Sequence, residues 1–569
     1  MDRLARVAYW SALMTPAALV LCLVLGYGVN IPYADQWDFI GYLTLLQDGR
    51  LRVADLFSLH NEHRMVFPKL LMLALARATG WNVVAEMLTS VAMVVAGLLL
   101  LVKLARPILD RAGRAAEIWA AFTISAMLFS LMQWENWLWG WQIQWFLAVL
   151  AAVATVAFAT WSLQSPRPWM HVSGAVAAAI VCQLSIASGA AIWVAAGAIL
   201  GFHRGWRRIL PVWAIAAIVV TALYLVGYVR PPHHPSPLVA LQHPLSFLIY
   251  LANYLSGPLG RSAMIGLAAT LAFIGLAAIA AVRHRREPEL FMPWIALGAF
   301  TGANAVLTGV GRVGFGPEQA LESRYVTISM LMSIALIPLG MLAPRAWPAA
   351  SRPSLRLVAG ASGAALLTIL TIVGDVRGMA GFDNFHGRMA AARECALVVE
   401  DASDDCLRHL YPKAEVVRDR MLVLRAYGWS GFPKDDRRNS ATLVLTGPGG
   451  TRTWSLEPND EPGGQIDEAE LVGGVLTIRG WAHHPRGNAD ITRRVVVVAG
   501  DTIVGEALVD MERQDVANHF HNPGYLRTGW RLRQEELSGL VGAQRLRAYL
   551  ILRDGVIALL GGETTVVGR

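Results

Sequence analysis

Charged residues are scarce in this sequence. Only 16% of its 569 residues are Asp, Glu, Lys or Arg, whereas 55% are hydrophobic. A soluble protein with a charged surface does not have this composition, so a single water-soluble domain is excluded. From Arg6 to Asp375, short charged clusters separate long apolar runs, whereas residues 375–569 have the composition of soluble sequence. The net charge of +8 does not indicate a nucleic-acid partner, because the Arg residues recur between apolar runs and do not line one face.

Cysteines are also few, and the HExxH pattern of zinc enzymes is absent. Cys22 and Cys182 fall within apolar runs, where a thiol usually packs. Cys395 and Cys406 flank ten residues at the start of the soluble part, and in an oxidising compartment they can form a disulfide. Two unpaired thiols are the alternative. The sequence indicates no metal site and no cofactor, and it leaves a divalent cation open.

The apolar runs are long enough for membrane-spanning helices. A span needs about 20 apolar residues, because the hydrocarbon core is roughly 30 Å thick. Eleven runs are predicted to span, two of them within the uncharged stretch 168–203 and joined near 185–189. The others are 9–29, 83–102, 115–133, 144–163, 209–229, 262–282, 290–309, 325–344 and 357–374. The first is too long in its apolar part for a typical cleaved signal, so we expect a retained helix.

The positively charged residues predict the orientation, because short cytoplasmic loops collect Lys and Arg. Alternate loops of this chain collect them. The clusters are Arg3 and Arg6; Lys103, Arg106, Arg111 and Arg114; Arg167; Arg204, Arg207 and Arg208; Arg283, Arg285 and Arg286; and Arg345, Arg352 and Arg356. The sequence therefore predicts a multi-pass protein of the bacterial inner membrane with a cytoplasmic N-terminus. The predicted periplasmic parts are residues 375–569 and the loops 30–80, 134–143, 230–261 and 310–324.

The predicted fold is a polytopic α-helical membrane protein of about eleven transmembrane helices, with a C-terminal periplasmic α+β domain that ends in a β-sandwich. Its predicted parts are a transmembrane domain (1–374), a periplasmic helical linker region (375–439) and the β-sandwich (440–569). Residues 471–481, 494–498 and 545–552 show the short apolar or alternating runs of strands. Asp554 and Gly555 are typical of a hairpin turn.

Two carboxylates follow the first apolar run directly. Asp35 and Asp38 stand three residues apart at the predicted membrane surface, where they can share one helical face. Partial desolvation at that surface suits a carboxylate to act as a general base. We predict both as catalytic candidates. Capping of the following helix by Asp35 is the alternative.

A dense polar cluster follows in the same predicted loop. Polar residues that return to the bilayer surface are unfavourable unless they are paired or used. We predict that these residues bind the substrate. The candidates are His60, Asn61, Glu62, His63, Arg64 and Lys69. They include no ligand trio with metal-site spacing.

Two later exported loops add candidates for substrate binding. They are Glu135 in the Trp-rich segment 134–141, and Arg312, Glu322, Arg324 and Tyr325 between the ninth and tenth predicted spans. The tryptophans of 134–141 are predicted to be interfacial anchors, with sugar-stacking platforms as the alternative. Arg324 stands where the chain re-enters lipid. It can bind a phosphate through two parallel N–H groups, or it can simply extend its charge to the interface.

An acidic motif directly after the first helix of a ten- to thirteen-span protein resembles the GT-C superfamily of membrane glycosyltransferases. The resemblance covers the layout of the membrane part. It implies a catalytic carboxylate at Asp35 or Asp38 and a donor-phosphate ligand at Arg324. Arabinofuranosyltransferases of this superfamily also carry a soluble domain after the last helix. The segments 480–482 (Gly-Trp-Ala) and 513–516 (Arg-Gln-Asp-Val) look like those of β-modules appended to bacterial glycosyltransferases.

The resemblance implies inverting transfer of a sugar from a polyprenyl-phosphate donor to the hydroxyl of a glycan, glycolipid or protein, on the periplasmic side of the inner membrane. A transporter or flippase for lipid-linked sugars is the first alternative, and it would carry charges deep within its spans. Most charges of this chain cluster at the span ends, which favours an enzyme. A scaffold for cell-envelope polysaccharide assembly is the second alternative.

Overall fold

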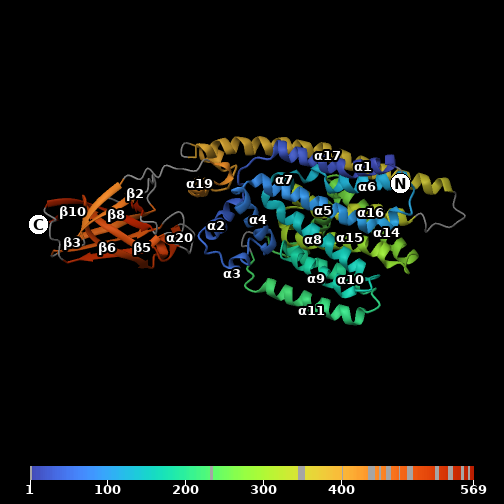
Figure 1. The fold of residues 1–569 in the computed structure, drawn as a ribbon, viewed down its shortest axis with the longest axis horizontal. Helices are drawn as coiled ribbons and strands as arrows, with labels where there is room; N and C mark the ends of the chain where they lie inside the picture. The colour runs from blue at the N-terminus through green and yellow to red at the C-terminus, as the bar shows by residue number, and fades with distance from the viewer. Residues whose placement is uncertain are drawn as a thin grey trace. The chain divides into compact units, whose positions relative to one another are not determined.

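The computed structural model describes most of the chain (Figure 1). The described residues are 3–230, 235–343, 353–399, 402–432, 442–447, 450–456, 463–472, 474–483, 491–519, 525–535, 542–552, 556–561 and 564–568. Some of the predicted features lie outside them. These are Arg345 and Arg352 of the last cytoplasmic cluster, and the turn at Asp554 and Gly555.

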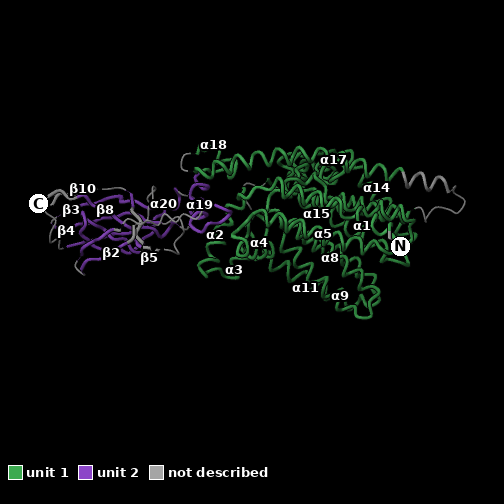
Figure 2. Tube along the Cα trace, turned by 45° about the horizontal axis from the view of Figure 1, so that its top comes forward, with its two compact units in different colours: residues 1–414 green, residues 415–569 purple. Residues whose placement is uncertain are grey.

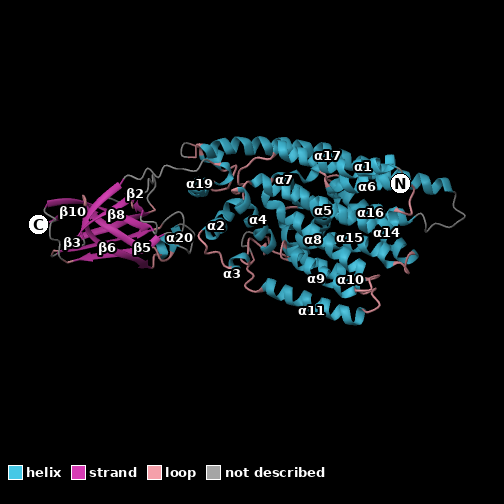
Figure 3. Ribbon diagram, in the orientation of Figure 1, coloured by secondary structure: helices cyan, strands magenta, loops and turns pink. Residues whose placement is uncertain are grey.

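The chain divides into two compact units, Met1–Ala414 and Glu415–Arg569 (Figure 2). Helices build the first unit, and every strand of the described residues lies in the second, between Thr442 and Gly568 (Figure 3). A polytopic helical protein with a C-terminal sheet domain is thereby confirmed. The predicted boundary at residue 374 falls inside α17 (Pro353–Leu397), a single helix of 45 residues.

Nine helices of the described residues are long and apolar enough to cross a membrane. Each of these candidate spans consists mainly of one long α-helix. The nine are α1 (Arg3–Tyr27), α5 (Val83–Leu109), α6 (Arg114–Leu128), α8 (Ile143–Ser162), α11 (Trp206–Leu225), α14 (Ala263–Arg283), α15 (Pro288–Arg312), α16 (Val326–Leu342) and α17. The two helices predicted within 168–203 are present but shorter. α9 (Pro168–Gln183) has 16 residues and α10 (Ala191–Leu200) has 10. The break between them, at η3 (Ala187–Ala190), overlaps the predicted junction.

Burial separates the central helices of this unit from the peripheral ones. α16 is buried over most of its length and contacts α8 and α15. α11 and α14 instead expose long apolar faces. Because water does not solvate such faces, helices of this length that expose them are typical of contact with lipid.

Short helices of the first predicted exported loop gather at one end of the bundle. They are α2 (Gln36–Gln47), α3 (Val53–Leu56) and α4 (Val66–Thr79). Figure 1 shows them at the end away from the N-terminus. In the same unit α7 (Trp134–Leu138), which lies shortly after α6, contacts η7 (Ser323–Tyr325), which precedes α16. Loops that are far apart in the sequence therefore come together beside the bundle.

The second unit consists of α19 (Ala414–Tyr427), a short helix α20 (Gln514–His519) and a ten-stranded sheet. The strands are β1 (Thr442–Gly447), β2 (Gly450–Leu456), β3 (Gly464–Val472), β4 (Val475–Ala482), β5 (Ile491–Ala499), β6 (Thr502–Met511), β7 (Gly529–Gln534), β8 (Gly542–Leu552), β9 (Val556–Leu559) and β10 (Thr564–Gly568). The predicted runs 494–498 and 545–552 lie in β5 and β8. The run 471–481 covers the turn between β3 and β4 together with most of β4.

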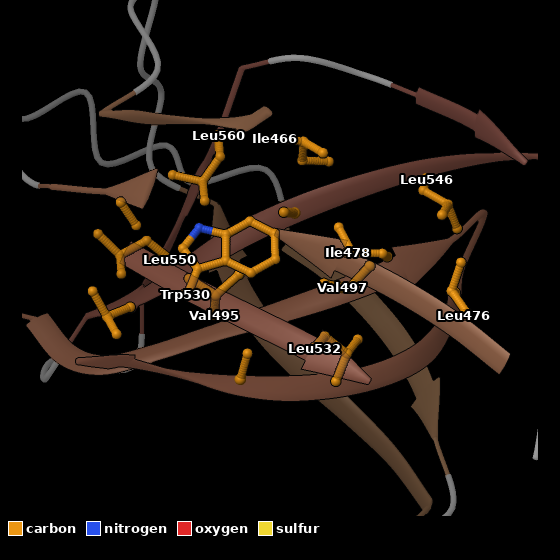
Figure 4. Close-up of a cluster of buried hydrophobic side chains, with 14 of the residues drawn as sticks. Ile466, Leu476, Ile478, Val495, Val497, Trp530, Leu532, Leu546, Leu550 and Leu560 are labelled. Carbon is orange, nitrogen blue, oxygen red and sulfur yellow. The ribbon is translucent and has the colours of Figure 1, made fainter. Parts of the chain in front are cut away.

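The sheet encloses its own core. The strand order is β1-β2-β9-β8-β5-β6-β7-β4-β3, with β10 beside β8. Gln465 of β3 also pairs with Gly561, which follows β9, so the edge strand β3 meets the far part of the sheet. The core between them includes Ile478, Trp530 and Leu550 (Figure 4).

Cys395 near the end of α17 and Cys406 in α18 (Asp404–Leu407) form a disulfide. The sequence leaves two possibilities for these cysteines, a disulfide or two free thiols. The structure favours the disulfide. The disulfide joins two cysteines of the first unit that are 11 residues apart in the sequence. It therefore restrains the chain just after the last long helix.

Candidate functional site

The loops beside the bundle surround a cavity of about 580 Å³. Its walls come from the first loop, the Trp-rich segment, the end of α15 and the segment η7. Nine candidate residues line it: Asp35, His60, Asn61, Glu62, His63, Glu135, Arg312, Arg324 and Tyr325. The remaining candidates, Asp38, Arg64, Lys69 and Glu322, are not among its lining residues. The structure thus brings most of the predicted site together from three loops.

Asp35 is the residue immediately before α2. Its backbone is already helical, with φ −56° and ψ −18°, and its side chain makes no capping hydrogen bond to the helix. Its Oδ2 atom lies instead 3.1 Å from Nε2 of His60. The capping role that was the alternative for Asp35 is therefore not realised, and its side chain belongs to the cavity.

A buried hydrogen-bond chain holds the turn that carries Asp35. The carboxyl of Glu86, in the first turn of α5, accepts from Nε2 of Gln36 at 2.7 Å and from Nε1 of Trp81 at 3.1 Å. Oε1 of Gln36 in turn accepts from the backbone N–H of Tyr33 at 3.3 Å. Sequence reasoning missed Gln36 and Glu86. The available signal was a carboxyl inside an apolar run, because ionisable residues within spans are rare and usually have a role.

Asp38 lies within the first turn of α2 and contacts a different part of the chain. Its Oδ1 atom accepts a hydrogen bond from the Tyr411 hydroxyl at 3.3 Å. The two carboxylates therefore do not point into one site as the sequence suggested. Asp35 precedes the helix and follows the positive φ of Ala34, 46°, which turns the chain at this point.

Residues 60–63 form a tight turn at the cavity wall. The backbone N–H of His60 and that of His63 each donate to the carbonyl of the other residue at 2.9 Å. Asn61 has a φ of 50°, a conformation that Asn adopts more readily than most residues. The ring of His60 packs edge-on against Trp141, with 4.8 Å between the ring centroids. This backbone fixes the positions from which His60, Glu62 and His63 line the cavity.

Glu62 forms the ion pair that joins the first loop to α15. Its Oε1 atom lies 2.8 Å from the guanidinium of Arg312 and 3.6 Å from Nε2 of His63. Burial raises the pKa of Glu62, but the positive charge that His63 carries when protonated and the permanent charge of Arg312 lower it by more, to about 2. Glu62 is therefore ionised at neutral pH.

His63 is held as the neutral imidazole. Burial lowers the pKa of His63, and the nearby charge of Glu62 only partly opposes this effect. Its Nδ1 accepts a hydrogen bond from the backbone N–H of Ala187 at 3.1 Å, which requires the proton on Nε2. Because His63 is neutral, Arg312 is the formal counterion of Glu62.

Arg64 supports the loop and does not line the cavity. It is buried, and its guanidinium donates only to backbone carbonyls among the hydrogen bonds seen in the described residues. The acceptors are Phe57, Tyr224 and Val226. The sequence predicts that Arg64 binds the substrate, but the structure places it where it fastens the first loop to the end of α11.

Lys69 has a similar structural position. It is fully buried in α4, and its Nζ donates to the hydroxyl of Tyr42 and to the carbonyl and hydroxyl of Ser58, at 2.8 to 3.0 Å. Burial and the neighbouring charge of Arg64 lower the pKa of Lys69 to about 8. The sequence predicts that Lys69 contacts the substrate, but in the structure it contacts Tyr42 and Ser58 and is not among the residues that line the cavity.

Arg324 lines the cavity from η7, immediately before α16. Its guanidinium pairs with Glu322 and lies 5.7 Å from the ring centroid of Tyr325. Its carbonyl accepts a hydrogen bond from Nδ2 of Asn136 at 3.0 Å, which ties η7 to α7. This connection brings Glu135 and Arg324 to the same cavity.

The tryptophans of segment 134–141 are mostly buried within the protein. Trp137, Trp139 and Trp141 are 0%, 6% and 2% exposed. An interfacial anchor must reach the lipid head groups, so the predicted anchor role is wrong for these three residues. Trp139 and Trp141 line the cavity, and Nε1 of Trp139 donates to the carbonyl of Tyr33 at 3.0 Å.

Among the described residues, no group of three or more His, Cys, Asp or Glu side chains is arranged to hold a metal ion. The cavity does contain carboxylates, two histidines and the guanidinium groups of Arg230, Arg312 and Arg324. A partly exposed carboxylate can accept a proton, and guanidinium groups can bind an anion such as a phosphate.

We expect Glu62→Gln to destabilise the protein by about 1.5 to 3 kcal/mol at neutral pH, because it removes a charge-assisted hydrogen bond to Arg312. The ordinary pKa of a glutamate is 4.5 and that of Glu62 in the fold is about 2, so the ionised form contributes stability that is complete above pH 4.5. This contribution is lost as the pH falls from 4.5 toward 2. Unfolding temperatures in detergent should therefore differ most at neutral pH and converge in acid. The control is Glu318→Gln, at an exposed position that does not line the cavity; an equal loss there, or a difference that does not depend on pH, would contradict the role of the ion pair.

No family model, curated protein or solved structure matches this chain. Its function must therefore be inferred from the cavity residues and from the layout of the membrane part.

Proposed function

We propose that this protein is an inverting GT-C-type glycosyltransferase that moves a sugar from a polyprenyl-phosphate donor to the hydroxyl of a glycan, glycolipid or protein acceptor. One observation carries the proposal. Asp35, directly after the first helix, and Arg324, directly before a late helix, line the same cavity. The reaction needs a base and an anion ligand, and the GT-C layout implies these two positions for them.

The chemistry assigns a role to each of the two side chains. The acceptor oxygen attacks C1 of the sugar while the bond between C1 and the phosphate oxygen breaks, and the electron pair of that bond stays on the phosphate. Asp35 takes the proton of the acceptor hydroxyl. Arg324, with Arg312 in the same cavity, stabilises the charge that develops on the leaving phosphate. Attack from the side opposite the phosphate inverts the anomeric carbon.

The position of the cavity suits a lipid-linked donor. Arg312 is the last residue of α15, and Arg324 stands at the start of the candidate span Ser323–Leu342. Both guanidinium groups therefore belong near the membrane boundary, where a polyprenyl phosphate keeps its head group. We place this boundary on the periplasmic side of the bacterial inner membrane, since the Arg clusters favour that orientation. The disulfide between Cys395 and Cys406 supports an oxidising compartment for the chain after α17.

A transporter is less well supported by the buried carboxyls. Glu86 and Asp375 lie within candidate spans. Glu86 accepts from Gln36 and Trp81, and Asp375 accepts from the hydroxyl of Ser130 and from a backbone N–H. Neither of them lines the cavity. They therefore hold neighbouring segments in place and do not mark a path for a substrate through the bundle.

Asp35→Asn should lower kcat by about 10²- to 10⁴-fold, because it keeps the shape of the side chain and removes the base. Donor binding and the unfolding temperature should change little. The measurement is transfer of radiolabelled sugar from a synthetic polyprenyl-phosphate donor by purified protein. Asp38→Asn is the matched variant, and its contact with Tyr411 predicts a much smaller loss. Near-normal turnover in both variants would remove these carboxylates from the mechanism.

Arg324→Lys should restore only part of the activity that Arg324→Ala loses, because Lys lacks the planar pair of donors that fits two phosphate oxygens. We expect a loss of about 10- to 100-fold in kcat/KM for the donor, which corresponds to one charge-assisted hydrogen bond. Steady-state donor kinetics at matched amounts of folded protein measure it. Arg77→Lys, at an exposed position in α4, is the control. Wild-type kinetics in Arg324→Ala would exclude a phosphate contact.

The orientation predicts the behaviour of reporter fusions. Alkaline phosphatase fused after Arg569 should be active, because it folds only in an oxidising compartment, whereas a fusion after Arg208 should be inactive. Green fluorescent protein at the same two positions should give the opposite result. A fluorescent fusion after Arg569 would show that the predicted orientation of the C-terminal unit is wrong.

A further inference from the structure

We infer that His60 is a positioning residue for Asp35, which it holds in the orientation from which the carboxylate takes the acceptor proton. The inference rests on the proposed function, because it gives His60 a part in that reaction. His60 lines the cavity, and its Nε2 lies 3.1 Å from Oδ2 of Asp35. The two atoms are close enough for an ion pair, although their angle is not that of a hydrogen bond.

Asp35 needs such a neighbour because the helix does not hold its side chain. A residue directly before a helix usually accepts hydrogen bonds from the first N–H groups of that helix, and those bonds fix its rotamer. Asp35 occupies this position at α2 without making the capping bond. Its carboxylate is 36% exposed, so water alone would leave it several orientations. His60 is the side chain that faces it.

His60 is itself fixed from two directions. Its backbone is locked by the reciprocal hydrogen bonds with His63, and its ring lies edge-on against the buried Trp141. Its side chain is only 18% exposed. A rigid imidazole of this kind can orient a more mobile carboxylate, since most of the ordering has already taken place in the folded loop.

The charged and titratable groups of the turn 60–63, and those that contact this turn in the ion pairs described above, come from three elements. Asp35 precedes α2, Glu62 and His63 belong to the same turn as His60, and Arg312 comes from α15. Glu62 and Arg312 neutralise each other, and His63 is neutral. Of these four residues, Asp35 is therefore the charged one that the other three do not neutralise, and its Oδ2 atom faces His60.

The role of His60 in the reaction follows from this geometry. Nε2 of His60 faces one oxygen of Asp35, Oδ2, which leaves the other oxygen to accept the proton of the attacking hydroxyl. The new C–O bond forms as the bond between C1 and the phosphate oxygen breaks, with its electron pair on the phosphate, and the proton on Asp35 then passes to water. His60 gains and loses no proton in these steps. It is therefore needed for the orientation of Asp35 and not for proton transfer.

Two substitutions test the role of His60 by kinetics. His60→Ala removes the neighbour of Asp35, and we expect kcat to fall about 10- to 100-fold with little change in the KM of donor or acceptor. His60→Gln places an N–H donor near the position of Nε2, so its kcat should return to within about fivefold of the wild type. The assay uses radiolabelled polyprenyl-phosphate arabinofuranose, with hexose donors of the same lipid in parallel. His243→Ala, at an exposed position outside the cavity, is the control. Wild-type kcat in His60→Ala, or a His60→Gln variant no better than His60→Ala, would overturn the inference.

A second measurement tests the pair without the reaction. Unfolding temperatures in detergent are compared for Asp35→Ala, His60→Ala and the double variant. If the two side chains hold each other, the double variant should lose no more than the larger of the single losses, because each single change already removes the contact. Additive losses would overturn the pairing. Absence of transfer by the wild type with every donor, together with non-additive losses, would refute the glycosyltransferase proposal and leave the pair in place.

Discussion

The structure depends on one constraint: a charged group beside a hydrocarbon core or in a protein interior needs a partner, because neither environment solvates it as water does. The first loop meets this constraint in two ways. Arg64 and Lys69 donate to carbonyls and hydroxyls of the protein, which fastens the loop to the end of α11 and to the segment after α3. Glu62 pairs with Arg312, which fastens the same loop to α15. These contacts shape the cavity wall.

The pairing also decides which groups are available to a substrate. Arg64 and Lys69 are buried and engaged with the protein, whereas the side chains of Asp35 and Arg324 are 36% and 29% exposed. Charged groups that are fixed before the substrate binds do not have to reorganise during the reaction, and this is the usual source of electrostatic catalysis. The proposed phosphate ligand Arg324 thus differs from the structural Arg64 in exposure, not in residue type.

The sequence predicts those features that have local signals. Long apolar runs indicate the helical bundle, alternating runs indicate β5 and β8, and the charged residues at span ends stand out as cavity candidates. Features set by distant contacts are not predictable in this way. Lys69 and Arg312 are both cations near span ends, and only the fold shows that one is buried against Tyr42 and the other lines the cavity. The role of Glu86 and the burial of Trp137 likewise depend on packing between helices, and the uncharged stretch 168–203 does not reveal how short its two helices are.

A structure of the protein with a bound polyprenyl phosphate tests the central claim most directly, since it shows where the lipid phosphate sits. We expect the phosphate inside the cavity, with its oxygens about 3 Å from the guanidinium of Arg324 and with Asp35 lining the same space. The polyprenyl chain should then leave the cavity toward the lipid-facing side of the helices. A phosphate bound elsewhere on the protein, with Arg324 still paired to Glu322 and the cavity holding only water, would contradict it.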